Sequence, residues 1–336
     1  MAEQDRDGSV KTVLVALAAN AGVAILKLVA GLVTGSGALL SEAAHSAGDT
    51  STELLLLTAN RRSGRPPDRL HPFGYGKERY FWSLLAAGAI FVSGATFSVY
   101  EGIRTIIERP ELQTAWLNYA VLAGAAVLEA LSLLQSLRHA RFEARSMRRS
   151  LGAYVRDPDD PAVKSVVLED SVALIGLALA ASGVALHQLT GSAVYDGCAS
   201  IAIGGLLVIT SGALAQTCKA LLIGKQADPR LMRAIERSLE TQPEVDDVVD
   251  MLTMQVGVDS VLLCARIDFV DTFTAADLEQ ACVRIDDQLR KEFDELQEIF
   301  LEPVPRSDPR LRARVLARYG RVIAEEPAND PDDANT

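Results

Sequence analysis

Residues 195–219 read YDGCASIAIGGLLVITSGALAQTCK, an apolar run with no charged side chain between Asp196 and Lys219. A helix of about 20 apolar residues is long enough to cross the hydrocarbon core of a bilayer. Further stretches of similar length and character lie at residues 12–34, 38–59, 80–104, 115–137 and 163–186. The sequence therefore predicts an all-α membrane bundle of six helices.

Charge separates this apolar part from the rest of the 336-residue chain. Up to Gly224 there are 19 acidic and 19 basic residues, whereas from Lys225 onward there are 25 acidic and 14 basic residues. We expect a short cytoplasmic segment at residues 1–11, a transmembrane domain at 12–224 and a cytoplasmic domain at 225–303. Nucleic acid is not an expected partner, because phosphate binding needs the opposite charge.

The polar C-terminal part has the pattern of a small α+β domain with helices on one face of a sheet. One helix is predicted to begin at the Asp228-Pro229 start signal, and Thr274 is predicted to cap another. Strands are predicted at 245–256, 260–270 and 298–302, which gives the ferredoxin-like order αββαβ. The tail at 304–336 begins with a basic segment of helical character and ends in an acidic stretch that we expect to be disordered.

Basic residues in the connecting segments predict the orientation, because they are enriched in cytoplasmic loops. The segments after the second and fourth helices contain Arg61, Arg62, Arg65, Arg69, Lys77, Arg79, Arg138, Arg141, Arg145, Arg148, Arg149 and Arg156. The segment after the third helix has only Arg104 and Arg109, so both termini are expected to be cytoplasmic. The short chain shows no signal peptide or transit segment, which suggests a bacterial inner membrane.

The second helix contains the strongest chemical signal, Glu42-Ala43-Ala44-His45-Ser46-Ala47-Gly48-Asp49. His45 and Asp49 are four residues apart and so share a helix face. A carboxylate near the bilayer centre costs about 2.5–3.5 kcal/mol on insertion scales and usually faces the bundle interior for a function. Imidazole and carboxylate are ordinary zinc ligands, although the same spacing also fits a structural His–Asp hydrogen bond.

The fifth helix has two adjacent carboxylates, Glu169 and Asp170, inside an otherwise apolar stretch. Two such acids need a cation or protons to neutralise them within a membrane. Together with His45 and Asp49 they make a four-ligand candidate metal site. The alternative is that both acids reach water at the cytoplasmic end of the helix.

A loop and several single polar residues give weaker signals. Asp68 and His71 have a spacing that suits a secondary metal site, but the loop has no third strong ligand, so a structured cytoplasmic loop is favoured. Interhelical hydrogen bonds or snorkelling are sufficient explanations for Asn20, Lys27 and Glu129.

These features together resemble the cation diffusion facilitator family of metal/proton antiporters. The similar stretches are residues 35–49 (GSGALLSEAAHSAGD), the loop at 71–79 and residues 221–229 (LLIGKQADP). The resemblance covers roughly residues 12–303, with the same order of six helices and a small C-terminal domain. The Glu169-Asp170 pair and residues 299–303 (IFLEP) look like the zinc transporter nine-like branch.

The resemblance implies a homodimer in the lipid bilayer that alternates between inward- and outward-facing states and exchanges a divalent metal ion for protons. It implies neither an enzyme nor a cofactor, because the metal is the cargo. Of the family's four site residues, His45, Asp49 and Asp170 carry over. The fourth position falls on Val166, which cannot bind metal, so Glu169 is the expected substitute.

The expected function is efflux of a divalent cation, and zinc is favoured because imidazole suits it better than it suits manganese. The alternatives are export of iron, manganese, cobalt or cadmium, or a membrane scaffold or sensor that does not transport. A membrane metalloprotease is not indicated, since the chain has no HExxH motif. No histidine follows His187, so we expect the soluble domain to dimerise without binding the additional metal that family members often hold there.

Overall fold

The computed structural model describes residues 2–111, 115–146, 161–258, 260–306 and 309–319. The chain divides into two compact units. The helical unit comprises Met1–Arg61 and Glu78–Lys219, and the sheet unit comprises Arg62–Lys77 and Ala220–Thr336. Residues 62–77, which the sequence prediction kept within the membrane domain, therefore belong to the sheet unit.

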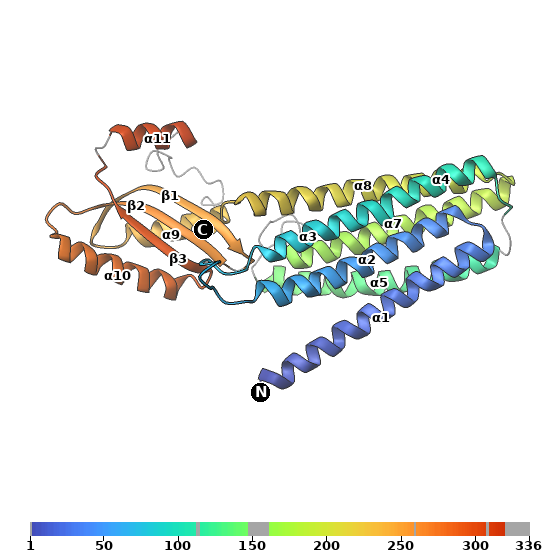
Figure 1. The fold of residues 1–336 in the computed structure, drawn as a ribbon, viewed down its shortest axis with the longest axis horizontal. Coiled ribbons are helices and arrows are strands. Elements are labelled where there is room, and N and C mark those ends of the chain that lie inside the picture. Colours follow the sequence, from blue (N-terminus) through green and yellow to red (C-terminus); the bar gives the residue numbers. More distant parts are fainter. Residues whose placement is uncertain (1, 112–114, 147–160, 259, 307–308, 320–336) are drawn as a thin grey trace. The chain divides into compact units, whose positions relative to one another are not determined.

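Long helices make up the helical unit, and Figure 1 shows α2, α5, α7 and α8 running along a common direction. In chain order the elements are α1 (Ala2–Thr34), α2 (Gly37–Ser63), α3 (Glu78–Ala89), the π-helix η1 (Ile90–Thr96), α4 (Phe97–Glu108), α5 (Ala115–Ser146), α7 (Pro161–Thr190) and α8 (Val194–Ile223). Because α3, η1 and α4 follow one another without a break, they form one long helical segment.

Several of these segments are long and apolar enough to cross a membrane. Within the described residues, four satisfy both conditions: Glu78–Glu108, Trp116–Gln135, Asp170–Thr190 and Val194–Ile223. α1 contributes a shorter apolar stretch, Asn20–Thr34. α2 is not among them, because Glu42, Asp49 and Glu53 interrupt its apolar residues. The predicted number of six is therefore supported for four segments.

Small residues allow the helices of this unit to pack closely. A Cβ atom added at Gly102 of α4 would lie 2.6 Å from the carbonyl oxygen of Gly197 in α8, and the reverse substitution would bring a Cβ to 2.7 Å from the Gly102 oxygen. Such glycine contacts are typical of membrane helices, where lipid gives no hydrophobic drive for association and packing must supply it. Leu39, Ile203 and Leu207 belong to the apolar core of this unit.

The sheet unit has the predicted element order αββαβ. Its elements are α9 (Pro229–Glu240), β1 (Val245–Gly257), β2 (Ser260–Phe269), α10 (Ala275–Glu292) and β3 (Leu296–Pro303), followed by α11 (Pro309–Tyr319). β1 pairs with β2 antiparallel and β2 pairs with β3 parallel, so the strand order is β1-β2-β3. This is the ferredoxin-like order βαββαβ without its first strand.

Both predicted helix starts are capped as expected. Asp228 accepts a hydrogen bond from the backbone amide of Arg230 at the start of α9, and Thr274 and Asp277 form a reciprocal capping box at the start of α10. The apolar sides of the two helices, including Ile235 and Ile285, pack on the same core as alternate residues of β2. The basic segment forms α11, as predicted, whereas the tail at 320–336 lies outside the described residues.

Candidate cation site

The N-terminus of α2 is held by a carboxylate from another helix. Asp196, in the first turn of α8, is fully buried, and its Oδ2 accepts hydrogen bonds from the backbone amides of Gly37 (2.6 Å) and Ala38 (3.3 Å). Its Oδ1 accepts a hydrogen bond from the Ser36 hydroxyl at 2.9 Å. These bonds satisfy amides that a helix start leaves without partners, and they fix the position of α2 against α8.

The predicted pair on α2 is brought together, but it does not form a hydrogen bond. His45 Nε2 lies 3.4 Å from Asp49 Oδ2. The His45 residue is only 7% exposed, and neither imidazole nitrogen has a hydrogen-bond partner among the described residues. The structural His–Asp hydrogen bond that the spacing also allowed is therefore not present. A buried imidazole with two unsatisfied nitrogens is instead suited to bind a cation.

Asp170 lies on α7 and faces α5. Its Oδ2 accepts a hydrogen bond from the Ser132 hydroxyl at 2.9 Å. It is also close enough to Asp49 for the two charges to interact. The side chains of Glu169 and Val166 lie outside the described residues, so the fourth ligand has no described position.

The candidate ligands do not converge on one point. Within the part of the chain that the structure describes, no three His, Cys, Asp or Glu side chains are arranged so that they could hold a metal ion together. The structure thus places His45 and Asp49 in direct contact and Asp170 nearby.

The sequence prediction did not place Glu129 near the candidate ligands. It lies on α5, one helical turn from Ser132, and its charge interacts with Lys27, His45, Asp49 and Asp170. The sequence contained one signal for this position. Glu129 and Ser132 are three residues apart, so they lie on the same face of a helix. When Glu129 is considered alone, the sequence does not indicate that it lies near the candidate ligands.

A π-helical segment borders the site. A Cβ added at Gly48, next to Asp49, would lie 3.6 Å from Ser93 Oγ and 3.7 Å from Ile90 Cα, both in η1. π-Helical turns inside longer helices occur frequently at functional sites. The hydropathy pattern of 80–104 predicted a regular helix there and gave no sign of the irregularity.

Asp68 and His71 form a structured loop in the sheet unit. Asp68 Oδ1 accepts hydrogen bonds from the backbone amides of Leu70 (2.9 Å) and His71 (2.7 Å), and Oδ2 accepts one from the Tyr75 hydroxyl (2.7 Å). These bonds, led by the one from Tyr75, hold the pKa of the Asp68 carboxyl below its usual range. The carboxylate is therefore engaged in shaping the turn, as the structured-loop interpretation predicts.

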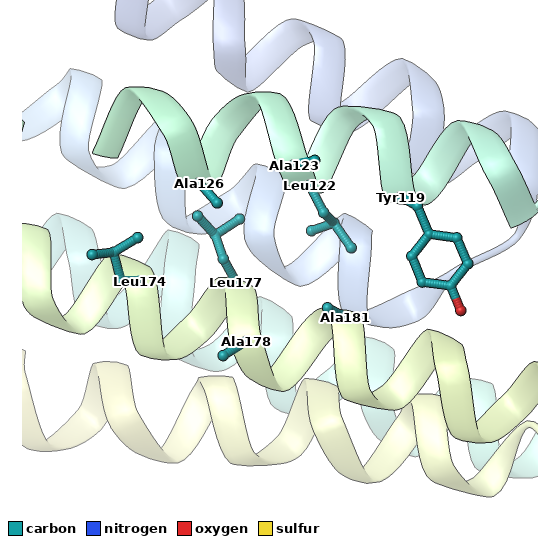
Figure 2. Close-up of a pocket in the computed structure, with 8 residues that line it drawn as sticks. All are labelled: Tyr119, Leu122, Ala123, Ala126, Leu174, Leu177, Ala178 and Ala181. Carbon is teal, nitrogen blue, oxygen red and sulfur yellow. The ribbon is translucent and has the colours of Figure 1, made fainter. Parts of the chain in front are cut away.

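A hollow of about 350 Å³ lies between α5 and α7, and its lining includes none of the candidate ligands. Figure 2 shows the side chains that line it. It is lined by Tyr119, Leu122, Ala123, Ala126, Leu174, Leu177, Ala178 and Ala181. None of these side chains carries a charge at neutral pH, so the hollow is not suited to bind a metal ion.

Comparison with known proteins agrees with a role in cation transport. The family described as "Cation efflux transmembrane domain" matches residues 13–223. The mitochondrial proton-coupled zinc antiporter SLC30A9 of Xenopus laevis is 35% identical over 262 residues, which are 78% of this chain and 47% of that protein. The chain thus spans about half the length of this relative.

Two further relatives cover more of the sequence. Metal tolerance protein C4 of Arabidopsis thaliana is 28% identical over 324 residues, 96% of this chain and 69% of that protein. The manganese efflux system protein MneP of Bacillus subtilis is 24% identical over 305 residues, 91% of this chain and 99% of that protein. This integral membrane chain therefore belongs to the cation diffusion facilitator family of transporters, on its zinc transporter nine-like branch.

Proposed function

We propose that the protein exports a divalent cation, zinc before other metals, in exchange for protons, by alternating access through a His/carboxylate site between α2 and α7. The observation that carries the proposal is His45, a buried imidazole beside Asp49 whose two nitrogens have no hydrogen-bond partner within the part of the chain that the structure describes. Leaving a buried polar group unsatisfied is unfavourable. A bound cation would supply the missing interaction.

The proposed ligands are His45, Asp49 and Asp170, with Glu169 as the fourth donor. Nitrogen and carboxylate oxygen donors in a set of four suit zinc. Because Asp170 is on α7 and the pair is on α2, a bound cation would draw the two helices together. Binding would thereby be coupled to helix packing, which is what an alternating carrier requires.

Protons enter this proposal through the ligands. A metal ion binds neutral imidazole and ionised carboxylates, so it competes with protons for the same atoms. On the side where the metal leaves, protons would take its place on the ligands. The empty carrier could then return without uncompensated carboxylates in the membrane, which would be unfavourable. The protein needs no other cofactor in this scheme.

The proposed carrier crosses the membrane six times, through α1, α2, the α3–η1–α4 segment, α5, α7 and α8. α2 is included although it is polar, because its ionisable residues would face the site and not the lipid. The basic residues in the segments that follow α2 and α5 support cytoplasmic termini. We propose a homodimer joined through the sheet unit, in a bacterial inner membrane. The name of the Xenopus relative makes a mitochondrial membrane the alternative.

Manganese is the second candidate substrate, because MneP is named for manganese efflux. The imidazole of His45 favours zinc, whereas manganese binds well to oxygen-only sites. A scaffold or sensor that does not transport is the alternative from a different class. It would retain the fold but would have no use for a buried His/carboxylate site.

Binding and flux measurements test the proposal together. The variants His45→Ala, Asp49→Ala and Asp170→Ala should each lose zinc flux in proteoliposomes and bind zinc weakly in detergent, because each removes one of about four ligands. Cys198→Ala, an exposed change on α8, is the control and should behave as wild type. Flux near the wild-type rate in any of the three would remove that residue from the site. No flux in the wild-type protein with zinc or manganese would favour the scaffold.

A further inference from the structure

A buried ion pair joins α1 and α2 beside the candidate site. Lys27 Nζ lies 3.1 Å from Glu42 Oε2, and both side chains are completely inaccessible. The same ammonium donates a hydrogen bond to the Ser46 hydroxyl at 2.8 Å. Lys27 is therefore not a snorkelling residue, since its charge is held inside the unit and away from water.

Glu42 is the next carboxylate on the site-bearing face of α2. It precedes His45 by three residues and Asp49 by seven, and both spacings keep a residue on the same side of a helix. The side-chain exposure falls along this face from 38% at Asp49 to 8% at His45 and 0% at Glu42. A cation that moves from the His45–Asp49 pair toward the α1–α2 turn would thus meet the Glu42 carboxylate next.

One oxygen of Glu42 is left without a partner. Oε1 is buried and has no hydrogen bond among the described residues, whereas Oε2 is paired with Lys27. Oε1 points at Gly176 of α7, where an added Cβ would collide with it. Glycine at 176 thus leaves room for the carboxylate and brings it against the helix that also carries Asp170.

Electrostatics explains why Glu42 is paired with Lys27 in the interior of the helical unit. A carboxylate alone at this depth would be strongly disfavoured, and the ammonium of Lys27 neutralises it. A divalent cation at Glu42 would take over this neutralisation and repel the ammonium. Lys27 and Glu42 thus stay paired when no cation is bound at Glu42. The charge of a bound cation would separate them.

We propose that Glu42 forms a second binding site for the transported divalent cation, called here the second station. Lys27 is the ion-pair partner of Glu42 that the cation displaces. This inference rests on the proposed function, because it assumes that a cation passes the His45–Asp49 pair. The station would have Glu42 Oε1 and Oε2 and the Ser46 hydroxyl as its oxygen donors. Hard and borderline divalent cations accept such donors.

The test uses the full-length protein with zinc as the probe. Lys27→Met frees the carboxylate and should allow one additional zinc ion to bind per chain, as counted by isothermal titration. That additional ion should be lost in the double variant Lys27→Met/Glu42→Gln. The double variant removes both charges with little change of shape, so it should still fold. Its zinc affinity at the first site should stay near that of wild type.

Flux separates a station from a structural pair. In proteoliposomes the double variant should transport zinc about tenfold to a hundredfold more slowly than wild type, the equivalent of one lost interaction with a charged group. The matched control is Thr34→Val, which removes another buried polar contact of α1, the hydrogen bond from Thr34 to Asn118. It should retain the wild-type rate.

Two results would overturn the proposal. One is a double variant that transports zinc as fast as wild type, which would leave the pair with a structural role only. The other is a Lys27→Met protein that binds no more zinc than wild type. A His45→Ala sample is measured in parallel. If His45→Ala and wild type gave the same flux, the proposed function would fail, whatever the pair does.

Discussion

At the scale of single residues, one face of α2 gathers buried polar atoms that have no hydrogen bond. Both nitrogens of His45, Oε1 of Glu42 and Oε2 of Glu53 have no hydrogen-bond partner in the described ranges of the chain. Such atoms are rare in native structures, and each calls for an explanation such as a catalytic role or an ion. Their presence on a single helix face agrees with a helix that handles cations.

The assignment of Glu169 is the first prediction at this scale. If Glu169 replaces the ligand that Val166 cannot provide, Glu169→Gln should weaken equilibrium zinc binding about as much as Asp170→Asn does. Isothermal titration of both variants checks this. Adjacent residues differ by about 100° around a helix, so the longer Glu side chain would have to turn back toward α2.

Other roles of Glu169 would give different results. A proton relay would leave zinc affinity intact and slow turnover, whereas a structural partner would lower stability or expression. Zinc affinity equal to wild type in Glu169→Gln would therefore exclude the ligand role. Restored transport in Val166→His/Glu169→Ala would support it, because that variant returns a ligand to the family position.

Asp68 gives a prediction about pH. Its pKa is held below the usual range by hydrogen bonds from Tyr75 and the loop backbone. A carboxyl with a lowered pKa stabilises the folded loop above its unfolded pKa, and the effect disappears as pH falls through the folded value. Asp68→Asn should thus speed amide hydrogen exchange at Leu70 and His71 at neutral pH. The difference from wild type should shrink below about pH 4. Equal exchange at neutral pH would contradict this account.

At the scale of elements, the start of α2 depends on α8. Asp196 caps α2, which is a role that the sequence could not reveal, because the two helices are far apart along the chain. Asp196 is also in the first turn of its own helix, where an acid is favourable. The hydrogen bonds hold the start of α2, whereas the position in the first turn stabilises α8 itself.

Removing this cap should destabilise the helical unit. Asp196→Ala leaves the buried amides of Gly37 and Ala38 unsatisfied, so we expect a loss of about 1–3 kcal/mol. The melting temperature in detergent measures it, with the exposed neighbour Cys198→Ala as the control. Asp196→Asn should lose less, because its amide oxygen still accepts a hydrogen bond. Unchanged melting of Asp196→Ala would show that α2 is held by other contacts.

Sequence pattern predicted the elements of this protein better than the contacts between them. The starts at Asp228 and Thr274 followed from local capping rules, which depend on neighbouring residues only. The Lys27–Glu42 pair and the Ser132–Asp170 hydrogen bond each join different helices. A single sequence does not predict how one helix is rotated relative to another. It could therefore identify His45 and Asp49 as candidate ligands, but not the residues of other helices that surround them.

At the scale of the whole molecule, the chain combines a helical unit with an acidic sheet unit. The predicted order αββαβ is confirmed in the sheet unit, whereas apolarity supports four of the six predicted membrane segments. α2 fails that criterion because of the residues that make it a candidate for transport. Hydropathy is thus a poor guide to a membrane helix that contains several ionisable residues.

The absence of histidine after His187 leads to a prediction for the whole chain. The triple variant His45→Ala/Asp49→Ala/Asp170→Ala should bind no zinc tightly but should still form the proposed homodimer, because we propose that the sheet unit makes the dimer contact. Isothermal titration and light scattering in detergent test the two statements. Tight, stoichiometric zinc binding by the triple variant would reveal another site. A monomeric variant would mean that the site residues contribute to assembly.

The central claim is that zinc crosses the membrane in exchange for protons through the site on α2 and α7. The most direct test loads proteoliposomes with a zinc-sensitive dye and imposes a pH gradient. We predict that wild-type protein moves zinc toward the acidic side, that a protonophore abolishes this movement, and that His45→Ala shows neither zinc movement nor proton counterflow. Zinc flux that ignores both the gradient and the protonophore, or that persists in His45→Ala, would contradict the account.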